Sequence, residues 1–136
     1  MASIRKEIPI DARPDDVWAA IRDVGAIHQR LAPGFVTDTR MEGEAARVVT
    51  FANGFVVREL IVDVDDAARR LAYAAVGGRS THHNASFQVF EDDAERTRLV
   101  WIADVLPHEV APPIEEMMEQ GARVMQRTLG AVGVRG

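Results

Sequence analysis

One apolar stretch, residues 55–64, carries two neighbouring side chains whose types suit proton transfer or anion binding, Arg58 and Glu59. A carboxylate such as Glu59 in a cavity wall would be shielded from water, and this raises its pKa. It would then serve as a general acid, a general base or a hydrogen-bond anchor. Arg58 offers the opposite chemistry, because a guanidinium binds a carboxylate or enolate oxygen through two parallel hydrogen bonds.

Only one of these two side chains can face the interior, because neighbouring residues on a strand point to opposite faces. One face would carry Val56, Arg58, Leu60, Val62 and Val64, and the other Val57, Glu59, Ile61 and Asp63. Alternation alone therefore favours a buried Arg58 and an exposed Glu59. A bulge would shift this register, so both orientations stay open.

Histidine and tyrosine supply further candidate groups. His82 and His83 are adjacent, so on a strand they diverge and cannot readily bind one metal ion. The chain has no cysteine, and we predict no metal site. His83 is a candidate acid, base or hydrogen-bond donor at a cavity mouth because imidazole titrates near neutral pH. Tyr73 is a candidate hydroxyl donor to a polar ligand group.

A long helix is predicted over residues 112–132. Its apolar residues recur at steps of three, four and seven and form one stripe: Ile114, Met117, Met118, Gly121, Met125, Leu129 and Val132. Pro112 and Pro113 suit the start of the helix, and Gly130 and Gly133 suit its end. Met117, Met118 and Met125 interest us most, because methionine adapts to varied apolar shapes.

The remaining signals predict seven strands and two short helices. The expected order is a first edge strand at 3–10, short helices at 14–25 and 26–31, and six strands at 35–41, 47–51, 55–64, 71–76, 83–90 and 97–106. Asn53 and Gly54 are a hairpin signal. Short turns between consecutive strands predict an antiparallel sheet with the long helix covering one face. A curved sheet around one helix also predicts an internal cavity, and residues 1–136 should form a single domain.

Composition narrows the class of protein. The net charge of −5 argues against a nucleic-acid partner, since phosphate attracts basic surfaces. The first residues do not resemble a signal peptide, and no apolar run approaches about 18 residues, so we expect no membrane span and a cytoplasmic location.

Several motifs in this order resemble the START-like, or SRPBCC, superfamily and within it the polyketide cyclase/dehydrase and lipid-transport group. They are Pro14-Asp-Asp-Val-Trp18, Val57-Arg-Glu-Leu with Leu71-Ala-Tyr73, Val76-Gly77-Gly78, Trp101 and the long helix. The resemblance implies an α+β helix-grip (Bet v 1-like) fold, in which a curved seven-stranded antiparallel sheet surrounds the C-terminal helix. It also implies that Glu59 matches a pocket glutamate, that Tyr73 is an inward aromatic residue, and that His83 and Phe87 occupy pocket-facing strand positions.

The function expected from these observations is the binding of a hydrophobic or amphipathic small molecule, such as a lipid, aromatic or polyketide-like compound. The predicted ligand-binding residues are Glu59, Tyr73, His83, Phe87, Met117, Met118 and Met125. The alternative is a cyclase or dehydratase acting in the same cavity, with no cofactor implied and no catalytic residue assigned. A homodimer through a sheet edge, or through the strand face of Val56, Leu60 and Val62, is a further possibility.

Overall fold

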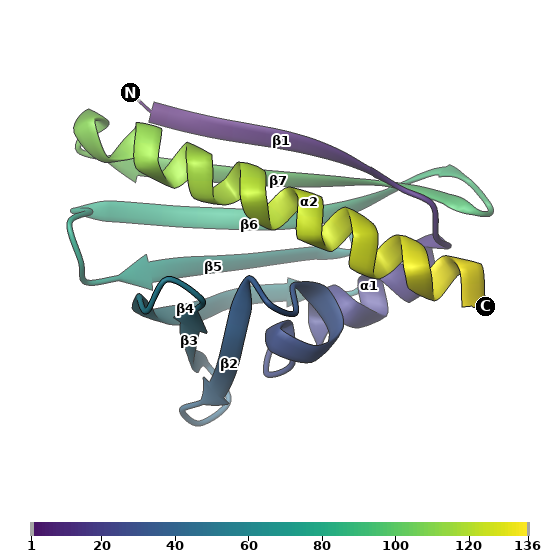
Figure 1. Cartoon of the computed structure of the whole chain (residues 1–136), viewed down its shortest axis with the longest axis horizontal. Helices are drawn as coiled ribbons and strands as arrows, with labels where there is room; N and C mark the ends of the chain where they lie inside the picture. Colours follow the sequence, from purple (N-terminus) through teal and green to yellow (C-terminus); the bar gives the residue numbers. More distant parts are fainter. Residues whose placement is uncertain (1, 136) are drawn as a thin grey trace.

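The protein is described by a computed structural model, which gives the backbone of residues 2–135 and the side chains of residues 2–131. A first strand is followed by two short helical segments, six strands, a 3-10 turn and a long helix (Figure 1). The strands are β1 (Ala2–Ile10), β2 (Val36–Met41), β3 (Ala46–Phe51), β4 (Val56–Asp65), β5 (Arg70–Val76), β6 (His82–Asp93) and β7 (Arg96–Leu106). The helical segments are α1 (Pro14–Arg22), η1 (Ile27–Leu31), η2 (His108–Val110) and α2 (Ala111–Arg135).

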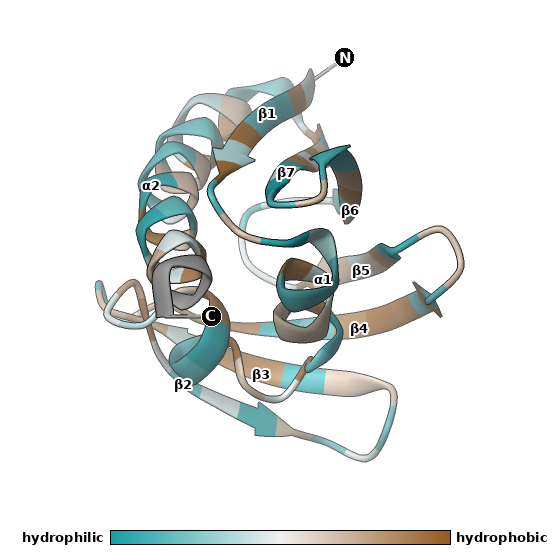
Figure 2. Cartoon of the chain, turned by 90° about the vertical axis from the view of Figure 1, so that its right-hand side faces the viewer, coloured by the Kyte–Doolittle hydropathy of each residue, from teal (hydrophilic) through white to brown (hydrophobic). Residues whose placement is uncertain are grey.

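All seven strands form one antiparallel sheet in the order β1-β7-β6-β5-β4-β3-β2. The sheet curls around α2 and α1, which lie on its concave side (Figure 2). The expected helix-grip fold is therefore confirmed, and β1 is an edge strand as predicted. Pro9 suits that edge, because proline cannot donate a backbone hydrogen bond.

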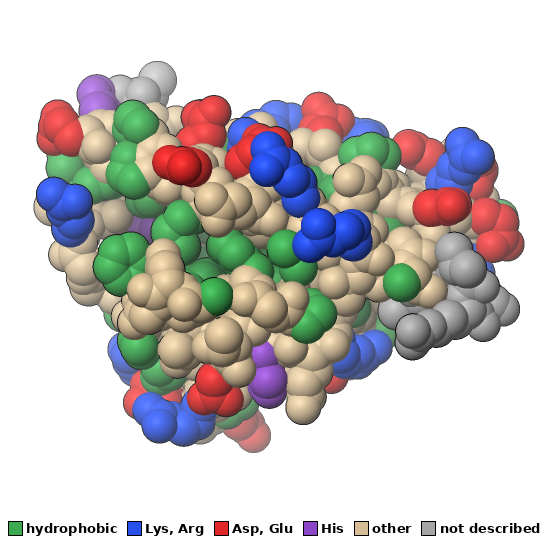
Figure 3. All heavy atoms as spheres, in the orientation of Figure 1, with side chains coloured by type: hydrophobic (Ala, Val, Ile, Leu, Met, Phe, Trp, Pro, Cys, Tyr) green, Lys and Arg blue, Asp and Glu red, His purple; other side chains and the backbone are tan. Residues whose placement is uncertain are grey.

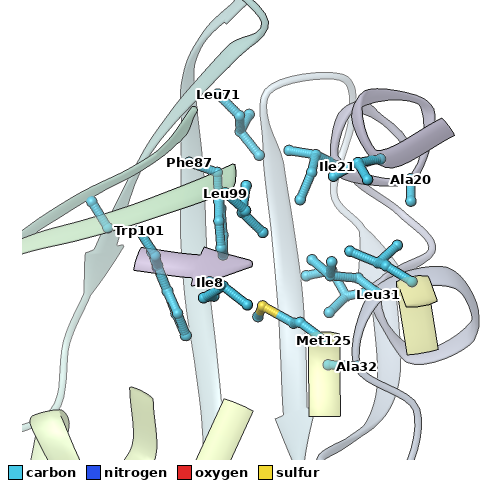
Figure 4. Packing of buried hydrophobic residues seen from close by; sticks show 14 of the residues in the cluster. Ile8, Ala20, Ile21, Leu31, Ala32, Leu71, Phe87, Leu99, Trp101 and Met125 are labelled. Atoms are coloured by element: carbon cyan, nitrogen blue, oxygen red, sulfur yellow. The ribbon is translucent and has the colours of Figure 1, made fainter. Parts of the chain in front are cut away.

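Helix α2 crosses the concave face and closes it. Met118, Met125 and Leu129 from its apolar stripe are buried, and they join a core that includes Ile8 and Leu99 (Figure 4). Lys6 on β1 pairs with Glu119 of α2 at 2.7 Å, which fastens the helix to the edge of the sheet.

Gly121 lies where α2 packs closely on the rings of Phe35 and Trp101. A Cβ atom at this position would lie 3.0 Å from Phe35 Cε2 and 3.3 Å from Trp101 Cζ3. The absence of a side chain therefore lets the helix approach these rings.

One local expectation needs correction. The long helix begins at Ala111 and continues to Arg135, past Gly130 and Gly133, because a glycine weakens a helix without breaking it. The second short helix is confirmed as η1, a single π-helical turn at Ile27–Leu31.

Alternation along β4 is interrupted by a register shift between Ile61 and Asp63. Before the shift, Glu59 and Ile61 lie on the concave side, where Ile61 pairs with the buried Tyr73. After it, Val64 pairs with the buried Leu71. The valines at 56 and 62 are instead about 60% exposed, at 62% and 60%. Up to Val62, the face that looks more apolar in the sequence is therefore the outer face, and the alternation-based expectation of an exposed Glu59 is wrong.

Candidate functional site

A buried ion pair lies on the concave side of the β3–β4 hairpin. Arg47 and Glu59 are direct partners across the two strands, and Arg47 Nε donates to Glu59 Oε1 at 2.8 Å. Their side chains are only 3% and 10% exposed. Arg47 Nη1 also donates to the carbonyl oxygen of Val24 at 3.1 Å, in the link between α1 and η1. The pair therefore connects the sheet wall to the segment that precedes η1.

Sequence analysis identified Glu59 but missed Arg47. The signal was present in the hairpin, because the Asn53-Gly54 turn fixes the pairing and the two residues are equidistant from Asn53 along the chain. Arg58, the arginine next to Glu59 in the chain, points outward. It donates to Glu42 Oε1 at 2.8 Å, and half of its side chain is exposed.

Three aromatic side chains from neighbouring strands form a stacked row beside the ion pair. The rings of Tyr73 and Phe87 lie 6.0 Å apart, and those of Phe87 and Trp101 lie 4.8 Å apart. Trp101 Nε1 donates to Tyr73 Oη at 3.0 Å, and the Arg47 guanidinium lies 5.1 Å from the centre of the Tyr73 ring. Since the Tyr73 oxygen accepts from Trp101, its own hydroxyl proton is available for donation to another group.

Burial controls the titration of this cluster. Desolvation raises the pKa of Glu59, and the positive charge and hydrogen bond of Arg47 offset part of that rise. The pKa of Tyr73 is also raised, mainly by burial and further by the charge of Glu59. Tyr73 is therefore a neutral hydrogen-bonding group at physiological pH, not a source of phenolate.

The ion pair and the aromatic row line a small space between the sheet and α2, which we call the inner hollow. Its volume is about 40 Å³, and its remaining wall comes from η1, the segment that follows it, β3 and α2, through Ile27, Leu31, Phe35, Val49, Phe51 and Met125, among others. A buried water needs roughly 10–15 Å³ of such space, so the hollow has room for about three waters. It is mainly apolar, with its charge confined to one wall.

Four of the seven predicted site residues line the inner hollow: Glu59, Tyr73, Phe87 and Met125. Met118 is buried in the adjoining core, and Met117 is half-buried, so neither belongs to this wall.

His83 is half-buried and lies outside the wall of the hollow. It points to the same side of β6 as Phe87, nearer the start of that strand. Desolvation, assisted by His82, lowers the pKa of His83, so its neutral form is favoured.

Hydrophobic side chains also reach the surface outside the inner hollow. In the view of Figure 3, they gather between α2 and the β2 region below it, and charged side chains lie around the edge of this area.

Neither a metal-binding cluster nor a membrane-spanning helix is found among the described residues. Its histidine and acidic side chains form no group of three or more that would hold a metal ion. None of its helices has the length and apolar character needed to cross a membrane.

The sheet topology and the site beneath α2 define the class as START-like helix-grip proteins. Within that class, residues 1–133 match the family described as polyketide cyclase / dehydrase and lipid transport, and the chain belongs to this family. No curated protein matches the chain.

Solved structures show the same fold. A protein from Thermobifida fusca superposes with a TM-score of 0.82 at 26% identity, covering 99% of this chain and 95% of that one. An aromatase/cyclase from Streptomyces sp. R1128 has a TM-score of 0.71 at 21% identity, with 98% and 94% covered. A START superfamily protein from Mycobacterium smegmatis has a TM-score of 0.73 at 10% identity, with 98% and 97% covered.

Proposed function

We propose that the protein binds a hydrophobic or amphipathic small molecule between its sheet and α2, with the Arg47–Glu59 pair as the polar anchor. The observation that carries the proposal is the position of this pair, buried in the wall of an otherwise apolar hollow. A buried ion pair contributes little net stability compared with well-packed apolar residues. Its presence here is therefore better accounted for by recognition of a ligand than by folding.

The chemistry of the wall defines the ligand. Arg47 uses Nε and Nη1 in its protein contacts, and Glu59 uses Oε1, which leaves Nη2 and Oε2 for a ligand. The Tyr73 hydroxyl adds a neutral donor. The flat row of Tyr73, Phe87 and Trp101 suits an aromatic or extended hydrocarbon body, since stacked rings present large apolar faces. The family's description, which covers both cyclases and lipid transport, supports this class of ligand.

The test is calorimetric titration with 2-naphthoic acid, which combines an aromatic body with one carboxylate, and with decanoic acid as a lipid-like probe. We compare the wild type with the double variant Arg47→Met/Glu59→Leu, because removing both charges leaves no stranded partner. The matched control is Arg58→Met/Glu42→Leu, which makes the same replacements at the exposed pair. We expect saturable binding that weakens at least tenfold, or about 1.4 kcal/mol, in the inner variant and is retained in the outer one. Absence of binding by the wild type, or equal affinity in both variants, would overturn the proposal.

A second candidate function, cofactor-independent cyclisation or dehydration in the same hollow, is favoured by one observation. Glu59 combines a raised pKa with a position beside Arg47 and Tyr73, so a proton-transfer group lies next to donors that would stabilise a developing oxyanion. Conversion of a linear poly-β-ketone thioester analogue, lost in Glu59→Gln with binding retained, would support it. Retained turnover in Glu59→Gln would exclude Glu59 as the proton-transfer group.

A further inference from the structure

The charged groups on the wall of the inner hollow cancel one another. Among the described residues that line the hollow, Arg47 is the one cation and Glu59 is the one anion. These two groups are paired at 2.8 Å, and their side chains are 3% and 10% exposed. The wall therefore carries no net charge, and it has no second cation to balance an anionic ligand.

The charged groups on the neighbouring elements do not alter this balance. Lys6 on β1 is already paired with Glu119 of α2 at 2.7 Å. His83 on β6 lies outside the wall, and desolvation, assisted by His82, lowers its pKa and favours its neutral form. Tyr73 on β5 is neutral because burial raises its pKa. The described parts of η1, β7 and α2 that line the hollow contribute no titratable group.

The free hydrogen-bonding atoms of the wall form a mixed set of donors and acceptors. Arg47 Nη2 and Glu59 Oε2 have no partner within the protein. Among the described residues, the buried side-chain atoms without a partner are His28 Nδ1 and Thr39 Oγ1, so Nη2 and Oε2 still contact open space. Nη2 and the Tyr73 hydroxyl donate, whereas an ionised Oε2 only accepts. A head group that both accepts and donates hydrogen bonds therefore satisfies this wall.

Net charge and hydrogen-bonding pattern together separate the candidate head groups. A primary amide, a phenol or an enol is neutral, accepts from Arg47 and donates to Glu59. A carboxylate has no proton to donate, and in a hollow of about 40 Å³ it would place a second negative charge beside Glu59. Two carboxyl groups in such a position share one proton, because the ionisation of both is unfavourable.

From these observations we propose that the hollow selects a neutral head group that both donates and accepts hydrogen bonds, and that it admits a carboxylate only together with one proton. This inference rests on the binding function proposed above and adds the chemical class of the head group. The proton comes from the solvent and is shared by Glu59 and the ligand carboxyl group. Arg47 stays charged, so the occupied wall has the same net charge as the empty one.

The preference depends on pH in a defined direction. Desolvation raises the pKa of Glu59, and Arg47 offsets part of that rise. Below this pKa Glu59 already holds the proton, so a carboxylate binds without further proton uptake. Above it the proton has to come from the solvent, so the affinity for a carboxylate falls about tenfold for each pH unit. A neutral head group needs no proton, and its affinity does not show this fall.

Two probes with the same aromatic body test the inference, 2-naphthoic acid and 2-naphthamide. Calorimetric titration in buffers of different ionisation enthalpy gives the affinity and the number of protons taken up, from about pH 6 to about pH 9. At the upper end we expect the acid to take up about one proton and to bind at least about tenfold more weakly than the amide, which takes up none.

The outcomes of these titrations separate the two proposals. Binding of the acid without proton uptake over the whole range, or equal affinities of acid and amide throughout, would overturn the selection of the head group and leave the binding function intact. Binding of neither probe at about pH 6 would overturn the binding function itself.

Glu59→Gln should reverse the preference. This change removes the negative charge of the wall and leaves the charge of Arg47 for the ligand, while the glutamine oxygen still accepts from Arg47 Nε. We expect 2-naphthoate to bind this variant without proton uptake, with an affinity that is independent of pH and at least about tenfold above that of 2-naphthamide. Proton uptake that persists in Glu59→Gln would assign the proton to another group and overturn the inference.

The matched control is Glu42→Gln, which makes the same substitution at the half-exposed partner of Arg58. The proton count and the preference should match those of the wild type, and a reversal in this variant would also overturn the inference. Circular dichroism checks the folding of Glu59→Gln. Because 2-naphthoate supplies the missing negative charge, it should raise the thermal midpoint of Glu59→Gln more than that of the wild type. The wild-type titrations decide the inference even if this variant does not fold.

Discussion

Two arginine–glutamate pairs of the β2–β3–β4 region have almost the same geometry and opposite surroundings. Arg47–Glu59 and Arg58–Glu42 both join Nε to Oε1 at 2.8 Å. The first pair is 3% and 10% exposed, whereas the second is 50% and 44% exposed. Glu59 and Arg58 are neighbours in the chain, so the pleat of β4 alone places one pair inside and the other outside.

Equal contact distances therefore do not give the two ion pairs equal effects on stability. Water screens the outer pair, so its removal has little effect on stability. The inner pair has lost its hydration, and either partner left alone would be a buried, uncompensated charge. That cost makes the inner pair sensitive to any group that enters the hollow, which is the property that a ligand anchor needs.

The largest expected effect is that of breaking the inner pair on one side. Arg47→Met leaves Glu59 buried without its partner, and we expect the free energy of unfolding to fall by about 3–5 kcal/mol. Urea unfolding followed by circular dichroism measures this change. The double variant Arg47→Met/Glu59→Leu should recover most of the loss. A loss below about 1 kcal/mol in the single variant would remove the distinction between the two pairs.

The next effect concerns the neutral hydrogen bond beside the inner pair. Tyr73→Phe removes the acceptor of Trp101 Nε1 and leaves that donor buried, so we expect a loss of about 1–3 kcal/mol in unfolding free energy. Chemical denaturation provides the measurement, with near-ultraviolet circular dichroism as a check that the stacked rings are retained. An unchanged stability would show that the indole has found another partner.

A smaller effect is expected from the outer pair. Glu42→Gln should change the unfolding free energy by less than about 1 kcal/mol, because Arg58 remains hydrated when its partner is lost. The same measurement at high salt should show almost no difference from the wild type, since salt screens exposed charges. A loss comparable to that of Arg47→Met would contradict the comparison.

The smallest effect is a pH dependence at another exposed carboxylate, Asp66. Hydrogen bonds from Arg22, and then from Trp18, lower its pKa below the ordinary value of 3.8. A lowered pKa means that the stabilisation is fully present above pH 3.8 and is lost as pH falls through the folded-state value. Asp66→Asn should therefore flatten the dependence of stability on pH below about 4. Parallel curves for the variant and the wild type would contradict the shift.

Much of the fold was predictable because its signals are local. The antiparallel order of seven strands and the long apolar stripe of α2 followed from periodicity and turn residues, and the helix-grip fold is confirmed. The end of α2 was placed too early, because glycine was taken as a stop where packing sustains the helix.

The candidate site was less predictable. Glu59, Tyr73, Phe87 and Met125 meet at the hollow, but the most informative partner of Glu59, Arg47, was not identified. Its role depends on strand register, and its sequence context resembles that of an exposed strand arginine. The roles of all these residues in ligand binding stay predictions until the titrations are made.

The sequence by itself determined the elements, their order and the family, because helical and strand periodicity, turn chemistry and motif order are properties of short stretches. Only the tertiary structure decided which face of β4 is buried, how Arg47 and Glu59 meet, and that Ile27 and Leu31 of η1 line the hollow beside them. These features depend on contacts between distant segments. The packing of the whole domain also sets the free-energy cost of burying these charged and polar groups.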